Sequence, residues 1–159
     1  MNSRELLIDT FAFMPPRHAI DGLSPADAER RLPNAPHSIA EIVAHLVFWQ
    51  TWFTRRAEGI HDAMVTSAAL GWPAVADGSW NDLRSRFEAG LERLAEVAGN
   101  VSNADTLLSP PLEFPPLAHY TIRDTVTHVA NHNAHHFGQI VVLRQMMGLW
   151  PPPSGSWTF

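Results

Sequence analysis

Four histidines lie close together in the stretch THVANHNAHHFGQI, residues 127–140. His128, His132 and His136 follow one another at intervals of four residues, which places them in one column on the same face of an α-helix. His135 lies next to that column. Two imidazoles four residues apart can bind one divalent ion at metal–nitrogen distances of about 2.0–2.1 Å. The stretch therefore predicts a metal site.

A structural explanation of the same histidines stays open. A single His-x-x-x-His pair arises easily by chance, and an isolated helical histidine more often hydrogen-bonds locally or faces solvent. Two overlapping pairs are harder to attribute to chance. In addition, burying several imidazoles without partners would cost a few kcal/mol in total, and a metal ion would satisfy them. The alternative is a purely structural helical bundle in which the histidines hydrogen-bond to one another and to carboxylates.

A third ligand has to come from another helix, and His45 in the stretch AHLVFWQ is the best candidate. Two long helices packed side by side would bring His45 opposite His132 and His136. The alternative is that His45 only packs beside Trp49.

Helix-start and helix-stop signals outline the elements that would position these residues. Capping patterns begin at Ser38, Ser79 and Thr121, and glycines follow the expected ends at Gly59, Gly99 and Gly148. The expected helices cover residues 3–14, 38–58, 79–98 and 121–147. The double proline at 15–16 should end or kink the first, a short helical turn follows Ser24, and segments 60–78 and 100–120 should be connections. The sequence predicts one all-α domain over residues 1–159, a four-helix bundle.

Composition narrows the function classes. The net charge of −5 and the scattered arginines argue against a nucleic-acid partner. Cysteine is absent, so His, Asp or Glu must hold any metal. No apolar run is long enough to cross a bilayer, and the N-terminus does not have the pattern of a signal peptide. We expect a soluble cytoplasmic protein without a membrane partner.

The pattern H-x-x-H-H-x-G-Q-I at residues 132–140, together with His45, resembles the DinB/YfiT-like superfamily. The resemblance implies a four-helix bundle in which His45, His132 and His136 hold one divalent metal ion. It implies that His135 is not a ligand and that His128 belongs to the pocket or to the shell around the ligands. Family members often carry arginine where this chain has Phe137, so we expect a more apolar surface there.

Relatives in that superfamily include metal-dependent transferases and isomerases that use small thiols such as mycothiol or bacillithiol, and proteins called putative hydrolases. Many of them form dimers. The resemblance thus implies a small-molecule substrate, in particular a low-molecular-weight thiol, and a homodimer.

Three neutral imidazoles leave an ion its full charge and an open position, so a bound water or thiol would become a nucleophile near neutral pH. We expect a metal-dependent enzyme of the thiol-dependent transferase type, with zinc, nickel or iron(II) as the ion. A non-catalytic or stress-related metal-binding protein and a metal-dependent hydrolase are the alternatives. The zinc-protease motif H-E-x-x-H is absent, because Asn133 stands where its glutamate would be.

The candidates for a catalytic role are Glu41 and His128. Glu41 lies one turn before His45 and would act as a base or orient that ligand, or it would only complete the capping box of its helix; Asp124 allows the same two interpretations. Further residues have either a site role or an ordinary one. They are the aromatics Phe48, Trp49 and Trp52 (pocket wall or core) and Gln139 (site or surface). We expect ordinary surface histidines at His18, His37, His61 and His119.

Overall fold

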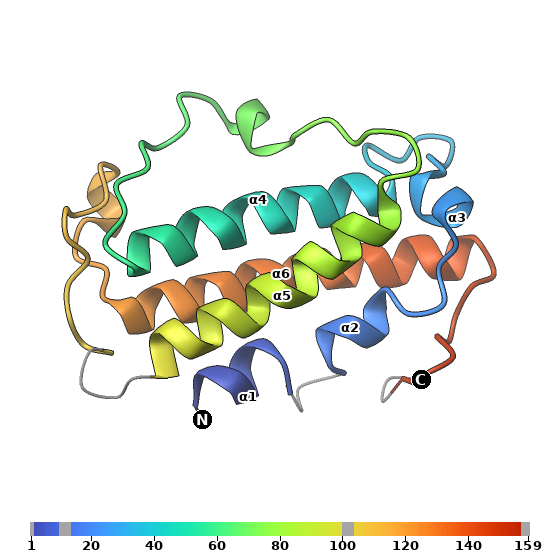
Figure 1. Cartoon of the computed structure of the whole chain (residues 1–159). Coiled ribbons are helices and arrows are strands. Elements are labelled where there is room, and N and C mark those ends of the chain that lie inside the picture. Colours follow the sequence, from blue (N-terminus) through green and yellow to red (C-terminus); the bar gives the residue numbers. More distant parts are fainter. Residues whose placement is uncertain (1, 10–13, 100–103, 157–159) are drawn as a thin grey trace.

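The computed structural model describes residues 2–9, 14–99 and 104–156 of the chain (Figure 1). Over these ranges the regular elements are helices, and the one strand-like pairing is an isolated antiparallel bridge between Leu107 and Thr121. The all-α fold is therefore confirmed.

Three long helices build the centre of the fold: α4 (Ile39–Ala57), α5 (Trp80–Gly99) and α6 (Ile122–Met146). In Figure 1, α4 runs alongside α6 and α5 crosses in front of α6, and α4 packs against both of the others. Their inward faces supply fully buried side chains, among them Leu46, Trp80, Phe87 and Ile140. This core fixes α4 and α6 side by side, which the predicted metal site requires.

Reciprocal capping boxes begin α4 and α6 at the expected residues. The Glu41 N–H donates to the Ser38 hydroxyl, and the Glu41 carboxylate accepts from the Ser38 N–H at 2.6 Å. Thr121 and Asp124 form the same pair of bonds at the start of α6. Each box satisfies two backbone donors that the first helical turn leaves without partners.

The N-terminal region is more broken than the sequence predicts. The helix expected over 3–14 is the short α1 (Ser3–Leu7), which ends where the Asp9 N–H bonds the Arg4 carbonyl; residues 10–13 lie outside the described ranges. Pro16 does not end a helix but begins α2 (Pro16–Ala19), because a first helical residue needs no N–H. With α3 (Pro25–Glu29) the described elements are six helices, and a count of four in the bundle stays a prediction.

The connection between α4 and α5 passes along the outer side of α4 (Figure 1). It contains the 3₁₀ turn η1 (Ala68–Gly71), and the Trp52 indole N–H donates to the Ala63 carbonyl at 3.2 Å. A second 3₁₀ turn, η2 (Pro115–Leu117), lies in the connection to α6. The first connection matters for the site, because it holds Gly71 and Trp72 against α4.

Among the described helices, none combines the length and the apolar character that a membrane crossing needs.

Candidate metal centre

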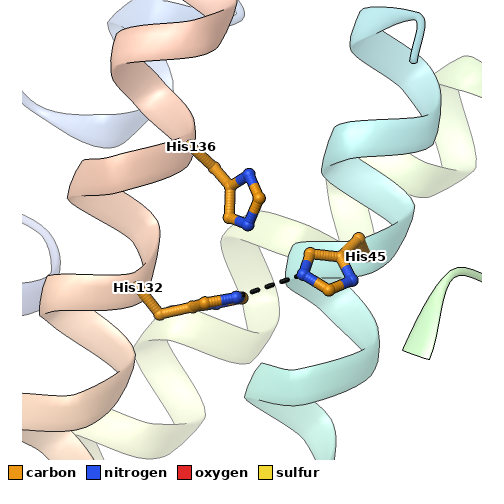
Figure 2. A group of neighbouring side chains, drawn as sticks. All are labelled: His45, His132 and His136. Atoms are coloured by element: carbon orange, nitrogen blue, oxygen red, sulfur yellow. Dashed lines mark hydrogen bonds between the residues drawn. The ribbon is translucent and has the colours of Figure 1, made fainter. Parts of the chain in front are cut away.

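Three histidines from two helices meet between α4 and α6. His45 comes from α4, and His132 and His136 come from consecutive turns of α6 (Figure 2). One ring nitrogen from each residue can be chosen so that all three lie within 4.8 Å of one another. His45 and His136 are buried and His132 is half-buried. The structure thus brings together the three residues that the sequence and the resemblance single out.

Each imidazole of this triad points toward the other two. The ring centroids lie 5.0 Å apart for His45 and His132, 4.8 Å for His45 and His136, and 4.7 Å for His132 and His136. The spacing of four residues aligns the two α6 side chains, and the packing of α4 against α6 supplies the third.

A backbone carbonyl fixes the orientation of His45. Its Nδ1–H donates to the carbonyl oxygen of Gly71 at 2.6 Å, so its Nε2 carries a free lone pair. That Nε2 lies 3.1 Å from Nε2 of His132. A side chain at position 71 would not fit, since a Cβ there would lie 2.8 Å from the Trp49 indole nitrogen. The glycine lets the connection come close enough to hold the ligand ring.

Trp72, the next residue, lies flat against the same ring. Its indole stacks on His45 at a centroid distance of 3.9 Å and an interplanar angle of 12°. His37 stacks on Trp72 at 3.7 Å and 8°. The expectation that His37 is an ordinary surface histidine is wrong: it is half-buried and forms the outer layer of a three-ring stack that leads to His45.

Gln139 orients the third ring. The Nδ1–H of His136 donates to the Gln139 side-chain oxygen at 2.8 Å, and the Gln139 amide donates to Nε2 of His135 at 3.2 Å. The site role for Gln139 is therefore the one the structure supports. His135 lies outside the triad and is linked to it through this amide.

Burial keeps the triad neutral. It is the main reason that the pKa of His45 is lowered to about 4 and that of His132 to about 3, and the neighbouring imidazoles contribute to both shifts. The pKa of His136 is also lowered, mainly by burial, against a smaller opposing effect of the Gln139 hydrogen bond. A neutral imidazole has the lone pair that a metal ion needs.

The donor set fits a divalent metal ion. Two nitrogens bound to one tetrahedral ion at about 2.0–2.1 Å lie about 3.3 Å apart, close to the 3.1 Å between the Nε2 atoms of His45 and His132. Hydrogen bonds hold the far nitrogens of His45 and His136, as is usual for metal-ligating histidines. His45, His132 and His136 could therefore bind such an ion after small side-chain movements.

The two candidate catalytic residues lie in different environments. The Glu41 carboxylate caps α4 and pairs with Arg31, and the partner of the His45 Nδ1–H is Gly71. The capping role of Glu41 is thus confirmed. His128 is half-buried, packs on Phe53 at a centroid distance of 4.5 Å, and has its Nδ1 3.1 Å from the Tyr120 hydroxyl. Burial lowers its pKa.

Two hollows lie along α6, one on each side of the triad. The first has a volume of about 890 Å³, and His136 and Trp72 are among its lining residues. The second has a volume of about 380 Å³, and Tyr120, His128 and His132 line it. The triad therefore contributes a ligand candidate to the wall of each hollow.

Other aromatic residues take core positions. Trp52 is buried, and Trp49 packs against the core and contacts His45 edge-on at 6.5 Å. Phe137 is also buried, against Phe87 on α5. The expectation that Phe137 makes the site surface more apolar is wrong. Trp72 is the tryptophan that lines the hollow beside His136.

The other predicted surface histidines differ among themselves. His61 and His119 are exposed, and His61 pairs with Glu113 at 3.0 Å. His18 is half-buried on α2.

A family model described as the DinB superfamily matches residues 17–140 of the chain. No curated protein and no solved structure matches it.

Proposed function

Because the chain belongs to the DinB superfamily, we propose that it is a metal-dependent enzyme that uses one divalent ion held by His45, His132 and His136. The proposed ion is zinc, nickel or iron(II), and the proposed reaction is the transfer of a low-molecular-weight thiol to an electrophile. The cytoplasmic location and the homodimer expected from the sequence stay predictions.

One observation carries the proposal: three imidazole nitrogens from two helices lie within 4.8 Å of one another. Their orientation supports it, since Gly71 and Gln139 occupy the outer nitrogens of His45 and His136. A structural cluster would not need two of its members oriented in this way from outside.

When bound, an ion of this kind lowers the pKa of a thiol or water ligand toward neutrality. In the transfer we propose, the thiol sulfur forms a bond to an electrophilic carbon, and the leaving group departs with its bonding electron pair. The thiol proton passes to His128. Burial lowers the pKa of this imidazole and so favours its neutral form, in which one ring nitrogen carries no proton and can accept one. His128 lines the same hollow as His132, which supports this role.

The hollows favour an enzyme over the alternatives. A non-catalytic metal-binding protein would have its site closed by protein, whereas His132 and His136 each line an open hollow. For a hydrolase the other candidate base is Glu41, but its carboxylate is engaged by Ser38 and Arg31.

A screen of thiols against cobalt-substituted protein tests the transferase. We expect one small thiol among cysteine, glutathione, mycothiol and bacillithiol to produce sulfur-to-cobalt charge-transfer absorption in the near ultraviolet. His132→Gln should abolish that band. If all four thiols left the spectrum of a cobalt-loaded protein unchanged, the thiol-transferase proposal would be wrong even though the metal site stood.

A further inference from the structure

The larger hollow lies between the C-terminal half of α6 and the segment that precedes α4. Val142, Leu143 and Met146 line it from α6, and residues 33–37 line it from the other side. One end meets the metal centre, because His136 and Trp72 belong to its wall. With about 890 Å³ it has the size of sites that enclose small organic molecules, about 300–1,000 Å³.

The wall of this hollow is apolar and uncharged. Ile42, Trp72, Val142, Leu143 and Met146 are among its lining residues, and none of the described lining residues is Asp, Glu, Lys or Arg. Val142 and Met146 are 52% and 63% exposed, although both are large apolar side chains. Burying such surface is favourable, so an apolar ligand would be stabilised here.

Polar side chains gather where the hollow meets the triad. His135, His136 and Gln139 lie on adjacent turns of α6 and are linked by hydrogen bonds. His37 is held against Trp72 by stacking. A ligand in this hollow would therefore meet hydrogen-bonding groups near the metal centre and an apolar wall farther along α6.

The smaller hollow has the opposite character. Tyr120, Asp124, Thr127, His128, Asn131 and His132 line it, so it offers hydroxyls, an amide and a carboxylate. A polar thiol suits this side and an uncharged apolar molecule suits the other. The linings of the two hollows thus differ in polarity.

We propose that the larger hollow binds the electrophilic co-substrate, an uncharged molecule with an apolar alkyl or aryl body that lies along Val142 and Met146. The identification as co-substrate rests on the proposed transferase function. The binding itself depends on the wall alone, so it is measured on metal-free protein as well.

The test uses N-phenyl-1-naphthylamine, an uncharged apolar fluorophore, titrated into metal-free and zinc-loaded protein. We expect one probe per chain in both forms, with enhanced fluorescence. Val142→Glu should weaken binding about tenfold or more, because a carboxylate would have to be desolvated beside the probe. Leu107→Glu is the matched control: Leu107 is 62% exposed and does not line this hollow, so affinity should be unchanged.

A competition experiment tests the ligand class. 1-Octanol should displace the probe from metal-free protein at concentrations about tenfold lower than octanoate, because none of the described lining residues is an Arg or Lys that could pair with a carboxylate. Met146→Glu provides a second variant at an exposed site and should behave as Val142→Glu does.

Several results would overturn the inference: no probe binding, equal binding by wild type and both α6 variants, or equal displacement by octanol and octanoate. If the wild type formed dimers and bound no probe, and Val142→Glu converted the dimers to monomers, this face would instead be assigned to contact with a second copy of the chain. Probe binding in a protein that takes up no metal would instead refute the proposed function and leave the apolar binding site in place.

Discussion

The Nδ1 nitrogen of His45 lies 2.6 Å from the carbonyl oxygen of Gly71, which comes from the connection outside α4 and not from a long helix. This bond sets the tautomer of the ring and directs Nε2 toward His132 and His136. The last residue of the short 3₁₀ turn η1 thus orients a proposed metal ligand on the long helix α4.

Replacing Trp72 should loosen His45. Trp72→Leu removes the indole that stacks on the ring at 3.9 Å, and loss of a group that holds a ligand in place typically weakens metal affinity about 10–100-fold. Trp72→Phe keeps an aromatic face and should lose less. Zinc affinity, measured by competition with a chromophoric chelator, checks both; an unchanged affinity in Trp72→Leu would show that the stack does not orient the ligand.

The metal-free protein should lose stability as the pH falls below about 6.5. Above that value neither the folded nor the unfolded state protonates His45. Between about 6.5 and the folded pKa of about 4, the unfolded state binds the proton and the folded state does not. As the pH is lowered through this range, the contribution of His45 to the free energy of unfolding therefore decreases by up to about 1.4 kcal/mol per pH unit.

Urea denaturation at a series of pH values measures this dependence. His132, with a pKa of about 3, acts in the same direction. His45→Gln should flatten the dependence in acid, and a variant with the slope of the wild type would contradict the assignment.

Removing the Glu41 carboxylate should lower the stability of the fold and leave metal binding unchanged. Glu41→Ala breaks the reciprocal bonds with Ser38 and the pair with Arg31, and the loss of a helix cap costs about 1 kcal/mol. Thermal unfolding and metal stoichiometry, measured on the same preparation, check the two parts. A stable variant that no longer held metal would instead place Glu41 in the metal site.

Two glycine-to-alanine substitutions should act in opposite directions. A Cβ at Gly90 would lie 1.9 Å from the buried Gln50 amide nitrogen, which donates to the Phe87 carbonyl. Losing that bond costs about 1–3 kcal/mol, more than the gain of up to about 1 kcal/mol in helix propensity. At Gly138 nothing lies within 4 Å of the added carbon, so only the gain applies.

Urea denaturation should therefore show Gly90→Ala destabilised and Gly138→Ala stabilised. If Gly90→Ala were as stable as the wild type, α4 and α5 would not approach as closely as described.

Local signals explain what the sequence predicted well. The capping boxes at Ser38 and Thr121 lie within single helical turns, so they mark the starts of α4 and α6 without any tertiary information. The four-residue spacing of His132 and His136 is equally local. His45 is a candidate because two long helices are expected to pack side by side, and the family resemblance indicates the same residue.

The remaining parts of the site depend on tertiary packing. Gly71, Trp72 and His37 lie outside the long helices, where no periodicity predicts their position. Phe137 directly follows His136, but each helical residue turns about 100° around the axis, so its ring faces Phe87 in the core. At the N-terminus, an apolar pattern over 3–14 did not reveal that α1 ends at Leu7.

The most direct test of the account is the metal content of protein purified without a histidine tag and then loaded with zinc, nickel or iron(II). Elemental analysis should find one divalent ion per chain for one of these metals, and His45→Ala and His132→Ala should each lose it while staying helical by circular dichroism. His135→Ala is the matched control on α6 and should keep the ion. A wild-type chain that retains none of the three metals, or a His45→Ala chain that retains a full equivalent, would contradict the three-histidine centre.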